Sequence, residues 1–234
     1  MTDEHRSVRL QSCGVGVTVG TYALGFGALA VANGFSVLQA VALSVLVFTG
    51  ASQFALVGVV GAGGSAASGA LASLAVGSRN AFYGLRLAPL LGVRGWRRLL
   101  AAQLTIDEST AVAISQRNQQ LARTGFWTTG AAVFVCWNIA TVTGALAVDQ
   151  ISDPKVIGLD AAVGAAFIAL LWPQLTTATT RAVAAGAAAL ALVLTPLLPP
   201  GLPVLAAAVV ALVIAWPEPR CPPEQPTSPD GPDE

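Results

Sequence analysis

The sequence predicts an all-α membrane protein that crosses the bilayer about seven times. Hydrophobic residues make up 54% of the chain and charged residues only 10%, whereas about a quarter of the residues in a soluble domain are charged. Long segments without formal charge each provide at least one crossing of about 20 residues. These segments cover residues 11–78, 124–148, 161–180 and 182–217. Continuous apolar runs, instead of alternating polar and apolar residues, favour helices over a membrane β-barrel.

Three parts make up the expected domain organisation. Residues 1–9 form a polar N-terminal tail, residues 10–216 the transmembrane transporter domain, and residues 217–234 a proline-rich tail that we expect to be disordered. Glycine, asparagine and proline mark the turns between spans. In chain order, the expected spans cover residues 13–32, 37–60, 65–91, 126–148, 160–173, 181–198 and 202–216. Residues 99–114 favour a helix, but their charges argue against a simple lipid-exposed span.

Small residues recur at every fourth position of the third expected span. Serine, glycine or alanine occupies positions 65, 69, 73, 77 and 81, and this spacing places them on one helical face. Small residues let membrane helices approach closely. We therefore expect this face to contact another helix, either in this chain or in a partner.

Arginine and lysine predict the orientation, because they concentrate on the cytoplasmic side of membrane proteins. Seven spans with the N-terminus outside leave most of these residues inside, including the cluster Arg94, Arg97 and Arg98. We therefore expect the N-terminus outside and the C-terminus inside. If residues 99–114 cross as an eighth span, the side of the N-terminus changes.

The sequence Gly-Ala-Leu-Ala-Val occurs twice, at residues 27–31 and 144–148, near the ends of the first and fourth expected spans. Chance is the alternative in a chain so rich in alanine. A true repeat displaced by three spans has inverted topology, which predicts two inverted repeats of three spans plus one. Transporters with this arrangement place a site near the midplane, between broken helices. Residues 48–54 would then face residues 160–173.

A polar break interrupts the second expected span at residues 48–54, where a glycine and three hydrogen-bonding side chains stand in an apolar run. If the helix unwinds at Gly50, freed backbone amides can bind a substrate carboxylate, with further contacts from Thr49, Ser52 and Gln53. The alternative is that the hydroxyls bond back to their own helix and Gln53 bridges to a neighbour.

Two polar residues of the fourth expected span, Asn138 and Thr141, lie three positions apart on one helical face. They are candidates to complete the substrate-binding site across the proposed repeat. Hydrogen bonding between helices is the more common use of such side chains in membrane bundles. Both interpretations stay open from the sequence.

Five charged residues in or next to apolar segments are candidates for ion coupling or a charge network. Arg79 and Arg86 lie inside the third expected span, where exposure to lipid near the bilayer centre would cost about 2.5–3.5 kcal/mol each. Asp107 and Glu108 offer acceptors for a proton or an ammonium group, and pairing of one of them with an arginine is a hypothesis. The alternatives are a solvated helix for these acids, and a helix-capping role for Asp160.

Four groups of residues carry a family resemblance. They are residues 48–54, then Arg79 with Tyr83-Gly84 and Leu87-Ala88-Pro89, then residues 104–108, then Gly158-Leu159-Asp160 with residues 167–171. In order and spacing, they resemble the AzlC family, the large subunit of bacterial branched-chain amino acid exporters, over about residues 10–200. The family usually reads Asn-x-Arg-His at the arginine segment. Here Asn80 stands at the histidine position, so a titratable group is lost.

The resemblance implies a secondary transporter subunit that exports leucine, isoleucine, valine and often methionine. It also implies a separate small four-span AzlD-type subunit as partner, and multi-pass insertion into the bacterial plasma (inner) membrane. We expect coupling to protons. A passive channel for small neutral solutes is the alternative function, since titratable groups are scarce and the spans are rich in glycine.

Other classes of function find little support. The formal net charge of zero argues against a nucleic-acid partner. His5, the only histidine, lies in the polar tail, and no nucleophile–base or metal-ligand arrangement is evident, so we expect no enzyme, no cofactor and no metal site. The three cysteines are widely separated and predict neither a disulfide framework nor a zinc site. A purely structural partner subunit stays open.

Overall fold

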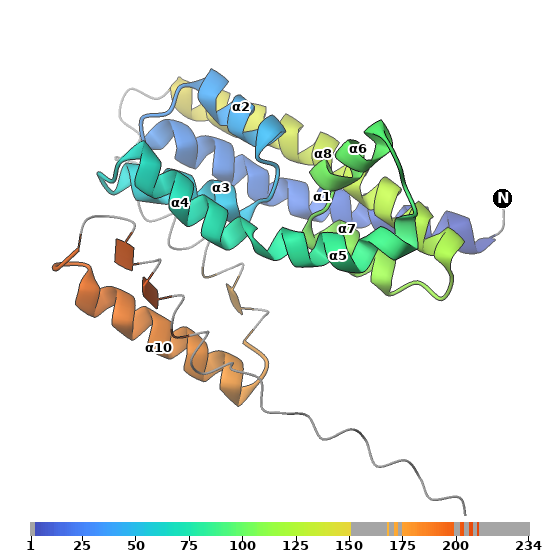
Figure 1. Ribbon diagram of the computed structural model, residues 1–234. Helices are drawn as coiled ribbons and strands as arrows, with labels where there is room; N and C mark the ends of the chain where they lie inside the picture. Colours follow the sequence, from blue (N-terminus) through green and yellow to red (C-terminus); the bar gives the residue numbers. More distant parts are fainter. Residues whose placement is uncertain are drawn as a thin grey trace, which may run out of the picture.

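The computed structural model describes residues 3–150, 168, 171–172, 175–198, 202–203, 206–207 and 210. Every regular element in these residues is a helix, which confirms the expected all-α class (Figure 1). The helices are α1 (Asp3–Ala32), α2 (Val37–Leu46), α3 (Ala51–Gly61), α4 (Ala66–Gly77), α5 (Arg79–Leu91), α6 (Trp96–Gln103), α7 (Asp107–Ile114), α8 (Gln119–Asp149) and α10 (Ala178–Leu194). Among the described residues, α1 and α8 are long and apolar enough to cross a membrane.

The central pair of helices, α1 and α8, runs in parallel along its whole length. Val8 lies against Gly125 near one end, and Gly20 lies against Cys136 further along. Because glycine has no Cβ, the two backbones approach closely at Gly16, whose absent side chain would collide with Ala132. Gly16, Gly20 and Gly27 therefore serve close packing of the two helices.

The repeated pentapeptides, residues 27–31 and 144–148, contact each other across this helix pair. Gly27 faces the backbone of Thr141, and Gly144 faces the backbone of Leu24. The glycine of each pentapeptide lies against the residue three positions before the glycine of the other copy. A local twofold axis therefore relates the two segments. The helices run in the same direction, so the expectation that these two spans are inverted copies is wrong.

The second expected span, residues 37–60, is not one crossing but a re-entrant helix hairpin. Along α2, Ser44 bonds to Thr141, and the following Phe48 contacts Phe134, so α2 runs antiparallel to α8. Along α3, Phe54 contacts Phe26, and Gly61 lies against Asn33, so α3 runs parallel to α1. The chain therefore enters the bundle, reverses at residues 47–50, and leaves at the same end.

Helices α6 and α7 form a second re-entrant hairpin that enters from the opposite end. Leu104 packs against Gly130 and Val112 packs against Gly125, so α7 runs antiparallel to α8. Ala101 of α6 and Ala113 of α7 share an apolar cluster with Leu91, the last residue of α5. Residues 99–114 thus reverse at residues 104–106, in agreement with the expectation that they are helical but not a simple span.

Helices α4 and α5 connect the two ends of the bundle. Ser78 between them keeps right-handed helical dihedrals, so they form one kinked segment. At its far end, Leu90 accepts hydrogen bonds from Arg123 and Gln119 in the first turns of α8. The expected small-residue face of α4 packs against α3, where Gly69 lies against Leu56. This confirms the predicted helix contact within the chain.

Three segments between residues 3 and 150, namely α1, α4–α5 and α8, run from one end of the bundle to the other, where four spans had been expected. Helix α10 covers most of the sixth expected span. The fifth and seventh expected spans fall mostly outside the described residues. The structure therefore leaves the total of seven spans as a prediction.

Candidate functional site

The tips of the two re-entrant hairpins meet in the middle of the bundle. We call residues 47–50 the first tip and residues 104–106 the second tip. Gln103, the residue before the second tip, donates from Nε2 to the carbonyl oxygen of Val45, near the end of α2 and before the first tip, over 2.8 Å. Phe48 and Ile106, one from each tip, belong to the same buried apolar cluster. Segments 58 residues apart in the chain are thereby joined.

Gly50 makes the first reversal possible. Its φ of 64° and ψ of −93° are strained for any residue with a Cβ, and α3 begins at the next residue. The predicted break of the helix at Gly50 is therefore present. Gln53 stabilises the reversal by bonding to both sides of it. Its Oε1 accepts from the Gly50 amide at 3.1 Å, and its Nε2 donates to the Leu43 carbonyl at 2.9 Å.

Ser109 stabilises the reversal at the second tip, which contains no glycine. Its Oγ accepts from the amide of Ile106 at 3.1 Å and donates to the carbonyl of Leu104 at 2.6 Å. Thr105 bonds back to the carbonyl of Ala101. These bonds satisfy backbone groups that the reversal leaves without helical partners.

A main cavity of about 730 Å³ opens beside the two tips. Its apolar lining includes Val19, Phe48, Ile106, Val133 and Trp137. Its polar lining is concentrated at helix beginnings: Gly50 and Ala51 start α3, Arg79 starts α5, and Asp107 and Glu108 start α7. Tyr83 and Thr110 complete the polar side. The cavity thus combines apolar lining residues with the positive ends of α3 and α7 and with the junction of α4 and α5.

An ion pair lies in the wall of the main cavity. Arg79 Nη2 is 2.8 Å from Asp107 Oδ2, and the two side chains are 36% and 41% exposed. The structure therefore confirms the hypothesis that an acid of residues 107–108 pairs with one of the two arginines. Arg79 Nε and Asp107 Oδ1 are buried without a hydrogen-bond partner, so each charge keeps capacity for a ligand.

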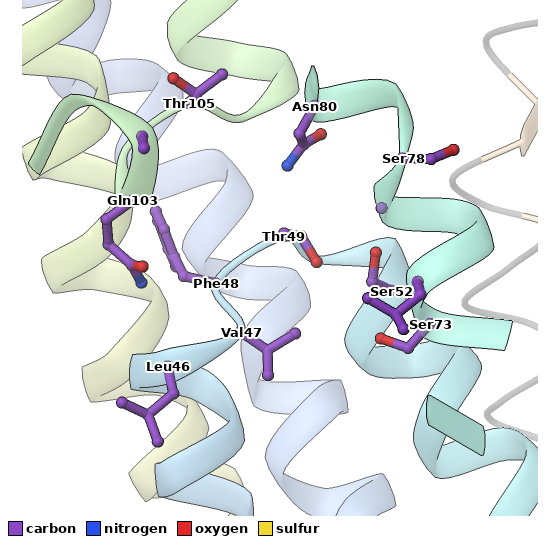
Figure 2. Close-up of a pocket in the computed structure, with 13 residues that line it drawn as sticks. Leu46, Val47, Phe48, Thr49, Ser52, Ser73, Ser78, Asn80, Gln103 and Thr105 are labelled. Carbon is purple, nitrogen blue, oxygen red and sulfur yellow. The ribbon is translucent and has the colours of Figure 1, made fainter. Parts of the chain in front are cut away.

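A small cavity of about 350 Å³ lies on the other side of the first tip (Figure 2). Phe48 and Thr49 line both cavities. The polar residues Ser52, Ser73, Ser78, Asn80, Gln103 and Thr105 also line the small cavity, and none of the described residues that line it is charged. Thr49 and Ser52 thus lie where the sequence suggested binding residues, but around a chamber that the sequence did not suggest.

Buried polar atoms without hydrogen-bond partners gather at these two cavities. In the described part of the chain they belong to Thr49, Ser52, Arg79, Asn80, Asp107, Thr110, Trp137 and Asn138. All except Asn138 line one cavity or both. Buried donors and acceptors are normally satisfied, so such a concentration marks these cavities as candidate binding sites.

Three residues that were predicted to bind the substrate line neither cavity. Both ends of the Gln53 amide are used within the first hairpin, and the side chain is fully buried away from both cavities. Thr141 accepts a hydrogen bond from Ser44 at 3.1 Å and joins α8 to α2. Asn138 donates to the carbonyl of Phe134 in its own helix and lines neither cavity. Gln53 and Thr141 thus make the contacts of the alternative interpretation, whereas Asn138 bonds within its own helix and not between helices; a role of the three in substrate binding stays a prediction.

The remaining charged candidates are dispersed. Arg86 is exposed and lines a separate depression with Arg117, away from the ion pair. Asp160 lies outside the described residues, so its role stays a prediction. Sequence reasoning missed Asn80, Thr110 and the indole of Trp137 as cavity residues. The sequence did contain a signal for Asn80, because this residue stands where the family usually has a histidine.

Comparison with known families agrees with this geometry. The sequence model of the family described as "AzlC protein" matches residues 14–151, which is more than half of the chain. The chain belongs to the AzlC family. The match contains both hairpin tips, Arg79 and Asp107. AzlC proteins form a membrane transporter family that is generally associated with branched-chain amino acid transport. No curated protein and no solved structure matches the chain.

Proposed function

We propose that this AzlC protein is the large subunit of a proton-coupled secondary transporter that exports leucine, isoleucine, valine and methionine. The observation that carries the proposal is the Arg79–Asp107 pair in the main cavity. An amino acid zwitterion carries one negative and one positive group on neighbouring atoms. A matched pair of opposite charges is the simplest arrangement that recognises both.

The substrate carboxylate is assigned to Arg79 and the amides at the start of α3. The guanidinium keeps free donors, and the positive end of α3 begins at Ala51 beside the same cavity. The substrate ammonium is assigned to Asp107, whose Oδ1 is without a partner. In this scheme the substrate inserts between the two side chains and replaces their mutual contact with contacts to itself.

The aliphatic side chain of the substrate is assigned to the apolar wall. Phe48, Ile106, Val133 and Trp137 line the same cavity as its polar groups. A branched side chain of four carbons gains about 0.8 kcal/mol for each CH₂ that leaves water, so an apolar wall favours leucine over alanine. Polar side chains would leave hydrogen-bonding groups without partners there and are disfavoured.

Glu108 is proposed as the proton-coupling group. It follows the substrate-binding Asp107 at the start of α7 and lines the same cavity. A carboxyl group in this position can exchange a proton with the cavity while Asp107 holds the substrate. The proposed transporter works in the bacterial inner membrane with a small four-span AzlD-type subunit.

Transport of labelled leucine tests this function. Vesicles that contain the protein and its proposed partner should show leucine counterflow, and an imposed proton gradient should drive leucine uphill. Asp107→Asn should abolish both activities, whereas Arg86→Gln, outside the main cavity, should retain them. Equilibration of leucine without counterflow or proton-driven accumulation would instead support the passive channel.

A further inference from the structure

We infer that the small cavity is a binding site for a dehydrated monovalent cation such as Na⁺. This site is separate from the main cavity, and it does not depend on the amino acid substrate proposed above. The inference rests on three features of the small cavity: unpartnered side-chain oxygens, the C-terminal ends of α2 and α6, and the absence of charged residues among its described lining residues.

The first feature is a set of buried oxygens without partners. Thr49 Oγ1, Ser52 Oγ and Asn80 Oδ1 are buried and make no hydrogen bond, and all three residues line the cavity. Ser52 is only 1% exposed. In Figure 2 their side chains come from the first tip, α3 and α5 toward the same space. Hydroxyl and amide oxygens are the neutral ligands that hard cations accept.

The second feature is the polarity of the helix ends. The lining contains Leu46 and Val47 at the end of α2, Gly77 and Ser78 at the end of α4, and Ala102 and Gln103 at the end of α6. A helix C-terminus carries the equivalent of about half a negative charge, and its last carbonyl groups lack helical donors. Because α4 continues into α5 through Ser78, the free ends are those of α2 and α6, and two such ends at one cavity favour a cation.

At the two reversals, the ends of α2 and α6 line the small cavity, whereas the first residues of α3 and α7 line the main cavity. The division is not complete, because Ser52 and Asn80, in the first turns of α3 and α5, also line the small cavity. Thr49 lines both cavities. Discontinuous helices of transporters use these two kinds of end for anionic substrate groups and for coupling cations, respectively.

The third feature selects a monovalent cation. Among the described residues that line the small cavity, none is Asp, Glu, Lys, Arg or His. Sites for Ca²⁺ and Mg²⁺ contain carboxylates, whose charge offsets the greater cost of dehydrating a divalent ion. A neutral cage with partial negative charge from helix ends fits a single positive charge.

Close packing at Gly77 brings α4 up to this site. A Cβ at Gly77 would lie 3.0 Å from Ser52 Oγ, so only glycine leaves the hydroxyl free of its neighbour. The small-residue face of α4 therefore does more than pack α3. It holds Ser73 and the end of α4 beside the oxygens of the first tip.

Cation-dependent thermal unfolding of the purified full chain tests the site. NaCl is exchanged stepwise for choline chloride at constant ionic strength and pH. We expect a saturable rise of the Tm with Na⁺, because a ligand that binds only the folded state stabilises it. Thr49→Val and Ser52→Ala should each weaken the Na⁺ affinity about tenfold or more, since each removes an oxygen from a charged ligand.

Two control variants locate the effect. Thr49→Ser keeps the hydroxyl and should keep the affinity within about threefold, well below the loss from a missing oxygen contact. Thr143→Val makes the same change as Thr49→Val, but on the exposed face of α8, and should bind like the unchanged protein. An equal response to NaCl and choline chloride would overturn the inference. So would a Na⁺-specific rise that neither Thr49→Val nor Ser52→Ala reduces. If one of these two variants does not fold, the other decides.

Discussion

Replacing Gly50 by alanine should weaken the first hairpin through backbone strain alone. The φ of 64° and ψ of −93° lie where residues with a Cβ pay about 1–3 kcal/mol. Space is not the problem, because the nearest atom to an added Cβ is Trp137 Cη2 at 3.6 Å, an ordinary van der Waals contact. We therefore expect Gly50→Ala to lower the free energy of unfolding by about 1–3 kcal/mol.

The same change should also lower leucine transport. The alanine is expected to relax the first tip, which displaces Thr49 and the start of α3 from both cavities. A shift of the binding groups by about 1 Å can reduce turnover by two orders of magnitude. Transport in vesicles and thermal unfolding in detergent measure the two effects on the same preparation.

Two glycines provide matched controls for this experiment. Gly34→Ala introduces alanine at a φ of 88°, with open space around the added Cβ, at a turn outside both cavities. It should lower stability in a similar way but leave leucine affinity unchanged. Gly84→Ala adds a methyl group within α5, where nothing lies within 4 Å, and should be neutral or stabilising. The reasoning is refuted if Gly50→Ala behaves like Gly84→Ala.

Three further predictions concern the charges and the central helix pair. Arg79→Lys keeps the charge but loses the planar fork, and should reduce leucine affinity about tenfold in binding assays, while retained affinity would argue against carboxylate recognition by Arg79. Glu108→Gln should abolish the pH dependence of export measured in vesicles, and an unchanged pH profile would exclude this residue from proton coupling. Gly27→Ala should lower the free energy of unfolding by at least about 1–3 kcal/mol, because its Cβ would collide with the backbone of α8. Gly14→Ala, with nothing within 4 Å, is its control, and equal stability of the two variants would contradict the close contact.

The sequence was informative where a single residue decides local geometry. Gly50 stands in an apolar run beside Thr49 and Ser52, and the helix does break there. The direction of the chain after the break could not be predicted, because an unwound turn allows either continuation or reversal. The reversal is evident only from tertiary contacts, such as those of Phe48 with Phe134 and of Phe54 with Phe26.

The second tip had a weaker local signal. Residues 104–106 contain neither glycine nor proline, and the reversal depends on hydrogen bonds of Ser109 that no spacing rule reveals. The charges of Arg79 and Asp107 suggested pairing because isolated charges are costly among apolar helices. Their shared cavity with Trp137 and Thr110 depends on how three helices meet, which is a property of the tertiary structure.

The parallel arrangement of α1 and α8 shows the same limit. The two copies of the pentapeptide lie against each other in the fold. Their relative direction depended on the number of crossings between them, and this number changed when one expected span proved to be a hairpin. A single error in span assignment therefore reversed the inferred symmetry of the fold.

Discrimination among leucine analogues tests the central claim most directly. The purified protein should bind leucine at least about tenfold more tightly than isocaproate, which lacks the ammonium group that Asp107 is proposed to bind. In Asp107→Asn protein this preference should largely disappear, while any preference over leucinamide, which lacks the carboxylate, should remain. An unchanged preference for leucine over isocaproate in Asp107→Asn protein would contradict recognition of the zwitterion by the Arg79–Asp107 pair.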